Sequence, residues 1–176
     1  MPELLHPLVR TAHILFGMGG FLLGAFALFL PKFGPHSRWH RWIGRGYGLS
    51  MLGMSVLSIP LSIRQGDWLL LVIGVLTLFW VVGGWWALRR WLQARATGQL
   101  EVARLWLGRH ITLMGSSYIA AWTAFLVNVQ PLGGSALLFT LYIAVPSIVG
   151  SVAIARAMIR QGRVSGQPFT RLQKGG

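Results

Sequence analysis

Five histidines have the clearest capacity in this chain to bind a metal ion or to transfer a proton. They are His6, His13, His36, His40 and His110. Carboxylates are scarce, because the only acidic side chains are Glu3, Asp67 and Glu101. The absence of cysteine excludes disulfides, thiolate metal sites and thiol catalysis. Paired-carboxylate catalysis and a Ser-His-Asp triad are also disfavoured, so we expect no catalysis by this chain alone.

Two of these histidines stand near the start of separate apolar segments. His40 precedes a segment that begins at Trp42, and His110 follows Trp106, where another segment begins. If both segments start on one side of a membrane and are neighbours, the two imidazoles can approach each other. Two imidazoles on facing helices are what a six-coordinate haem iron requires. The sequence therefore offers His40 and His110 as metal ligands, with haem b as the candidate cofactor.

Three arginines adjoin this histidine pair. Arg41, Arg45 and Arg109 can pair with haem propionates, because a guanidinium matches a carboxylate through two parallel hydrogen bonds. The alternative is that His40 and His110 are interfacial residues that bond to backbone or lipid phosphate and hold no cofactor. A zinc ion shared by His36 and His40 would lack an obvious third ligand.

His13 lies about one turn inside the first apolar segment. The expected role of its side chain is a hydrogen bond to a neighbouring helix, although an ionisable group inside a membrane is by default a functional candidate. A transport pathway is a further alternative, because one segment carries several polar side chains that can line it: Thr112, Ser116, Ser117, Thr123 and Asn128. Hydrogen bonds from these hydroxyls to backbone explain them equally well.

The elements that must position these residues are membrane-spanning helices. The chain has 176 residues, of which 54% are hydrophobic and 11% are charged, against about 25% charged in soluble domains. Its apolar runs have the length that crosses a hydrocarbon layer about 30 Å thick. They lie at about 8–30, 42–63, 68–88, 106–129 and 135–158. Because backbone groups cannot stay unpaired in lipid, we predict an all-α bundle of five transmembrane helices.

The basic residues fix the expected orientation. Fourteen of the sixteen Lys and Arg residues fall on one side of these spans, and only Arg10 and Arg64 fall on the other. The positive-inside rule then places the N-terminus outside and the C-terminus in the cytoplasm. We expect a multi-pass protein of a bacterial cytoplasmic membrane that contacts anionic lipid head groups and binds no nucleic acid.

One transmembrane domain is expected over residues 1–160, followed by a flexible basic tail over 161–176. Glycines four residues apart, at Gly20 and Gly24 and again at Gly44 and Gly48, predict close helix packing or a flat ligand lying over them. Pro60 and Pro146 are expected to kink or end their helices.

Three stretches also resemble a bacterial membrane-protein family of unknown function. They are Thr11-Ala12-His13, the His-Arg-x-x-Gly-Arg motif at residues 40–45, and residues 110–125 with His110, Met114, Ser117 and Tyr118. The resemblance covers about residues 8–150. It implies a small polytopic protein without an established activity, with His13 and Tyr118 among its site positions. A looser resemblance links the pattern to membrane b-type cytochromes.

The function expected from these observations is a non-catalytic accessory, scaffold or small-ligand-binding membrane component. Two alternatives are a haem b electron carrier that uses His40 and His110, and a small-molecule transporter. A membrane-protein partner or a second copy of the chain is a possible assembly partner. Each function depends on which helices are neighbours.

Overall fold

The computed structural model describes residues 2–30, 37–130 and 134–165. These ranges form five helices and contain no strand, which confirms the all-α prediction. The helices are α1 (Pro2–Phe29), α2 (Ser37–Gln65), α3 (Trp68–Ala96), α4 (Leu100–Val129) and α5 (Ala136–Ser165). All five are long and apolar enough to cross a membrane, so the chain has the architecture of a multi-pass membrane protein.

The helices are longer than the apolar runs that predict them. The run at 68–88 belongs to a helix that continues to Ala96, and α4 begins at Leu100 rather than near Trp106. The reason is that an apolar run marks only the part of a helix inside hydrocarbon, while the hydrogen-bonded turns continue into the polar flanks. For the same reason α5 continues to Ser165, so it includes the first five residues of the tail expected over 161–176. Residues 166–176 lie outside the described part.

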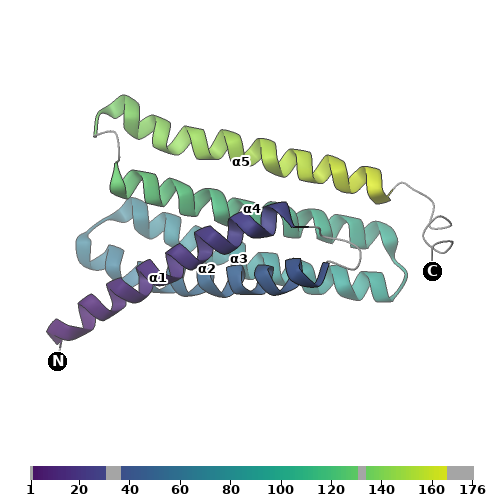
Figure 1. The fold of residues 1–176 in the computed structure, drawn as a ribbon, viewed down its shortest axis with the longest axis horizontal. Coiled ribbons are helices and arrows are strands. Elements are labelled where there is room, and N and C mark those ends of the chain that lie inside the picture. The colour runs from purple at the N-terminus through teal and green to yellow at the C-terminus, as the bar shows by residue number, and fades with distance from the viewer. Residues whose placement is uncertain (1, 31–36, 131–133, 166–176) are drawn as a thin grey trace.

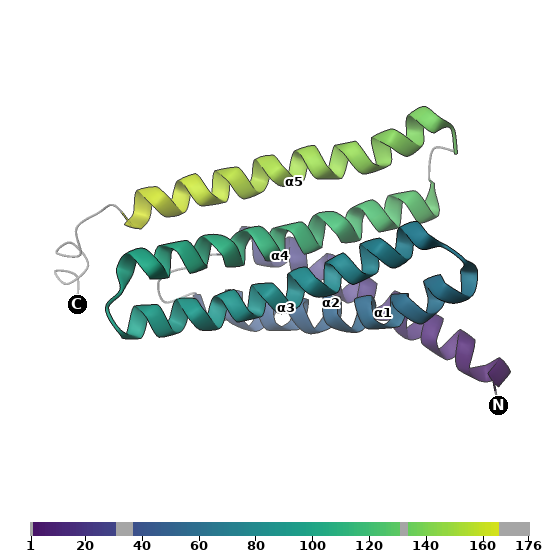
Figure 2. The same ribbon diagram turned by 180° about the vertical axis from the view of Figure 1, so that it is seen from behind.

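Helices α1 to α4 run alternately up and down, and α5 lies along the outer side of α4 (Figure 1). Neighbouring helices in the sequence pack against each other, and α1 also touches α4, which closes the four-helix arrangement. Seen from behind, the N-terminal part of α1 diverges from the bundle, and α5 keeps its position beside α4 (Figure 2). Helices α2 and α4 therefore run in the same direction.

Short turns join the central helices. In the α2–α3 turn, Gly66 adopts a φ of +70°, and the Asp67 side chain accepts a hydrogen bond of 3.0 Å from the Leu70 amide at the start of α3. The α3–α4 turn at the opposite end uses Gly98 with a φ of +72°. Pro60 and Pro146 were expected to kink or to end their helices. Neither ends its helix, because α2 continues past Pro60 and α5 past Pro146.

The core of the bundle is a cluster of buried side chains from three helices, Tyr47 and Met51 of α2, Val81 of α3 and Ala121 of α4. Phe21 of α1 packs against this cluster. The centre of the bundle formed by α1 to α4 is therefore filled by side chains at this level.

Three of the four paired glycines serve close packing. A Cβ atom at Gly20 would lie 2.9 Å from the Met51 sulfur, one at Gly24 would lie 2.5 Å from the Tyr118 ring, and one at Gly48 would lie 2.6 Å from the Trp85 ring. Gly44 is different, because a Cβ atom there would meet nothing within 4 Å.

Candidate functional site

Tyr47 of α2 and Ser117 of α4 connect two diagonal helices inside the bundle. Their hydroxyl oxygens lie 2.7 Å apart, and the Tyr47 hydroxyl also donates to the Met114 carbonyl at 3.3 Å. Both side chains are at most 4% exposed. This contact shows which faces of α2 and α4 are turned toward each other and which residues of the two helices share one level.

His40 and His110 each precede one residue of the Tyr47–Ser117 hydrogen bond by the same number of residues. His40 lies seven residues before Tyr47, and His110 lies seven residues before Ser117. Seven residues are two helical turns, so each histidine lies on nearly the same face as the residue seven places later, about 10 Å along the axis. Because α2 and α4 run in parallel, this shared offset puts the two histidines at a similar level of the bundle, where the His40 ring bonds to α1 and the His110 ring bonds to α3.

Hydrogen bonds to helix carbonyls orient both imidazoles. Nδ1 of His40 lies 3.1 Å from the Ala27 carbonyl oxygen of α1, and Nδ1 of His110 lies 2.9 Å from the Gly84 carbonyl oxygen of α3. A carbonyl only accepts, so in each neutral ring Nδ1 carries the hydrogen and Nε2 carries the lone pair. Metal-binding histidines commonly show this arrangement, in which a backbone carbonyl fixes the tautomer and the ring orientation.

Gly44 lies one helical turn after His40 and makes no close contact with another helix. Gly44 lies four residues after His40 and three before Tyr47, and therefore on the same side of α2. A side chain there would start from a Cβ atom with no neighbour within 4 Å. Gly44 therefore sits, along α2, between the level of His40 and that of Tyr47.

The basic side chains gather at this same end, which we call the basic end. The described arginines there come from α2, α3, α4 and α5: Arg38, Arg41, Arg45, Arg89, Arg90, Arg95, Arg104, Arg109, Arg156 and Arg160. Only one of them pairs with a carboxylate within the described ranges, Arg104 with Glu101 at 2.7 Å.

The three arginines predicted to accompany a haem do not all point toward the histidines. Arg45 lies over the Trp42 ring at 5.5 Å, and Arg109 lies over the Trp106 ring at 4.5 Å. Arg41, Arg45 and Arg109 are all exposed. They therefore flank the histidine level from the surface of the bundle rather than from its interior.

Two other predicted site residues join helices. Nδ1 of His13 lies 3.0 Å from the Met54 carbonyl oxygen, so His13 connects α1 to α2, as expected, in the half of the bundle away from His40. The Tyr118 hydroxyl donates to the Phe21 carbonyl at 3.1 Å, and its ring packs over Gly24. Tyr118 thus connects α4 to α1. His36 lies outside the described residues, and no group of three metal-binding side chains occurs among those described.

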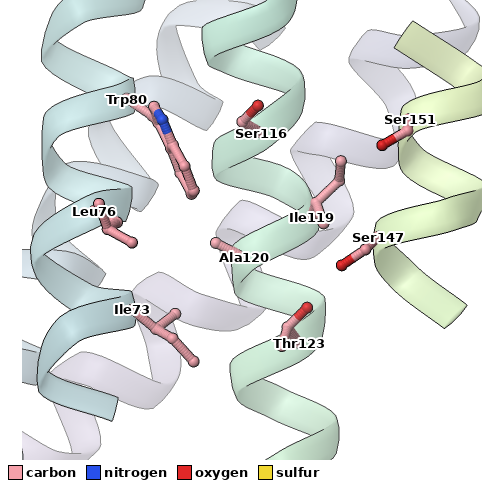
Figure 3. A pocket seen from close by; sticks show the side chains of 9 residues that line it. All are labelled: Ile73, Leu76, Trp80, Ser116, Ile119, Ala120, Thr123, Ser147 and Ser151. Atoms are coloured by element: carbon pink, nitrogen blue, oxygen red, sulfur yellow. The ribbon is translucent and has the colours of Figure 1, made fainter. Parts of the chain in front are cut away.

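A separate groove lies on the other side of α4. It has a volume of about 250 Å³, and α3, α4 and α5 line it with Trp80, Ser116, Thr123, Ser147 and Ser151 among other residues (Figure 3). The sequence reasoning noted Ser116 and Thr123 only as polar residues of one span. It missed Trp80 and the α5 serines, although the spacing of four between Ser147 and Ser151 is a signal that both share a helix face.

The hydrogen bond between Tyr47 and Ser117 was not predicted from the sequence either. The signal was the repeated spacing of seven residues, His40 to Tyr47 and His110 to Ser117, which only acquires meaning once α2 and α4 are known to face each other.

Compared with family models, with curated proteins and with solved structures, the chain matches none. The resemblances drawn from its motifs therefore stay predictions.

Proposed function

We propose that this chain is a non-catalytic accessory protein of a bacterial cytoplasmic membrane that binds a small ligand, haem b, between His40 and His110. The observation that carries the proposal is the matched register of the two histidines. Each lies two turns from a hydrogen bond that joins the facing sides of α2 and α4. Two imidazoles at one level of parallel helices are the arrangement by which helical bundles hold a haem iron.

The local chemistry fits this ligand. The carbonyls of Ala27 and Gly84 accept from Nδ1 of the two rings, so Nε2 would be the atom of each that ligates the iron. A Cβ atom at Gly44, one turn after His40, would meet no neighbour within 4 Å, so a flat ring can approach α2 there. Arg41 and Arg109 directly adjoin the two histidines in sequence, and their exposed side chains are long enough to turn toward propionates at the surface.

A bound haem supplies one-electron transfer. The part played by the chain is to hold it, because His40 and His110 would ligate the iron while α1 and α3 fix the angle of each ring through the carbonyl bonds.

The orientation proposed for this protein places the basic end in the cytoplasm. The arginines of that end outnumber the basic residues of the opposite end, where the described part of the chain has Arg10 and Arg64. With that orientation the arginines face the anionic lipid head groups of the inner leaflet.

Visible absorption of purified variants tests the haem site. His40→Ala and His110→Ala are each expected to lose the Soret band and the reduced α and β bands of the wild-type protein produced with ample haem. His13→Ala is the matched control, because His13 also bonds to a helix carbonyl but lies in the other half of the bundle. Full haem spectra in both His40→Ala and His110→Ala would refute the ligand assignment.

A second variant separates loss of the ligand from loss of the fold. Gly44→Leu fills the space beside His40, where even a Cβ atom has no neighbour, so the variant is expected to fold and to lose haem. Its helix content by circular dichroism and its elution volume should equal those of the wild type. A Gly44→Leu protein with a complete haem spectrum would show that the ligand does not lie in this space.

A further inference from the structure

The groove on the outer side of α4 is distinct from the histidine site. Helix α4 forms its floor with Ser116, Ala120 and Thr123, Trp80 stands on the α3 side, and Ser147 and Ser151 reach toward it from α5 (Figure 3). Each helix contributes residues from near the middle of its length. Trp80 lies near the centre of α3 (Trp68–Ala96), Ser116 near that of α4 (Leu100–Val129) and Ser151 near that of α5 (Ala136–Ser165). In a membrane the groove therefore lies at mid-depth.

Several polar hydrogens in this groove have no acceptor. Within a helix, a serine or threonine hydroxyl usually donates to the carbonyl three or four residues earlier, as Ser147 does to Ile143 at 2.7 Å. Ser116, Thr123 and Ser151 make no such bond within the described part of the chain. Thr123 lines the groove and is only 8% exposed.

Trp80 adds a further donor. A buried or membrane-embedded indole N–H normally finds an acceptor, whereas that of Trp80, which lines the groove, makes no hydrogen bond within the described residues. At mid-depth there is little water to compensate, so unpaired donors cost free energy. Four donors around one groove, with no charged side chain among its lining residues, favour a neutral ligand that carries acceptor oxygens.

The size of the groove restricts the ligand further. About 250 Å³ is below the range of roughly 300–1,000 Å³ typical of sites that enclose a whole drug-sized molecule. Leu76 and Ser151 at the rims are exposed, so the groove is accessible from the surface that faces lipid. A head group fits this space while an attached apolar tail remains among the lipid chains. The Trp80 ring offers an aromatic surface for a flat ring.

We propose that the groove between α3, α4 and α5 binds the ring of a lipid-soluble quinone. A quinone is neutral and flat, and its two carbonyl oxygens accept the hydrogen bonds that Ser116, Thr123, Ser151 and Trp80 can donate. An isoprenoid or alkyl tail leaves through the side open to lipid. This assignment needs no haem, because none of the lining residues belongs to the histidine site.

Binding of decylubiquinone to the full-length protein in lipid nanodiscs tests this proposal. Saturable binding with a stoichiometry of one is expected for the wild type. Ser151→Phe places a ring at the mouth of the groove and is expected to abolish binding. Val152→Phe is the matched control, because Val152 is the next residue of α5, is exposed and does not line the groove. Absence of saturable binding by the wild type, or equal binding by Ser151→Phe, would overturn the proposal.

Removing single hydroxyls from the groove tests whether they donate hydrogen bonds to the carbonyl oxygens of the quinone. Thr123→Val and Ser116→Ala are each expected to weaken decylubiquinone binding about 2- to 10-fold, the equivalent of one hydrogen bond. Ser147→Ala should have no such effect, because its hydroxyl already donates to Ile143. Decylcyclohexane, which has no oxygen, should not compete. Competition by decylcyclohexane at similar concentrations would identify the groove as an apolar lipid contact and contradict the quinone assignment.

Discussion

Two fully buried serines of the bundle differ in their hydrogen bonds. Ser117 Oγ bonds to the Tyr47 hydroxyl and to the Met114 carbonyl, whereas Ser55 Oγ has no partner within the described ranges. We predict that Ser117→Ala lowers the free energy of unfolding by about 1 kcal/mol, since a buried bond is lost. Ser55→Ala should be neutral within about 0.5 kcal/mol or stabilising, because it removes an unpaired polar atom. Unfolding of both variants in detergent mixtures measures the difference, and equal losses would contradict this account.

At the level of single residues, the sequence identified the side chains that can bind a metal ion, but not the residues that they contact. It selected His40 and His110 because histidine is the main metal-binding side chain in a chain without cysteine. It could not identify the Ala27 and Gly84 carbonyls as their partners, because every residue has a carbonyl and only the packing of helices selects one. Tyr47 and Ser117 were inconspicuous for the same reason.

Helix packing gives a second prediction from a matched pair of glycines. Gly24→Ala would place a methyl group 2.5 Å from the Tyr118 ring, and we expect the repacking to cost about 1–3 kcal/mol of stability. Gly44→Ala meets no neighbour, so the better helix propensity of alanine should stabilise the protein by about 0.5–1 kcal/mol. Thermal unfolding of the two variants in one detergent compares them. A Gly24→Ala protein as stable as Gly44→Ala would refute the tight α1–α4 contact.

At the level of helices, the sequence predicted the number and approximate centres of the spans correctly. Each apolar run contains enough residues to cross the hydrocarbon, and a helix is the only way to satisfy its backbone there. The ends were predicted less well, because α4 begins at Leu100 among polar residues and α5 continues to Ser165. Hydrogen bonding along a helix does not stop where hydropathy falls.

At the scale of the whole molecule, the distribution of arginines leads to a prediction of topology. The basic end carries Arg38, Arg90 and Arg109 among others, while Arg10 and Arg64 lie toward the other end. We therefore predict that a reporter fused after the C-terminus is active only in the cytoplasm, and that one fused at the N-terminus is active only outside. A C-terminal reporter active outside the cytoplasm would contradict the proposed orientation.

The arrangement of helices around the bundle was beyond sequence reasoning. Five apolar helices can pack in many orders, and the charge pattern distinguishes only their ends. The structure places α2 and α4 on facing sides and α5 along the outside of α4 (Figures 1 and 2). That arrangement brings His40 and His110 to one level, and it also creates the groove that α5 shares with α3 and α4.

The haem content of the purified full-length protein, measured as its pyridine haemochrome against protein concentration, decides whether His40 and His110 bind haem b. With one histidine pair on α2 and α4, we predict one haem b per chain after expression with ample haem. A featureless visible spectrum and a ratio near zero would contradict it and would leave His40 and His110 as residues that join helices through carbonyl bonds.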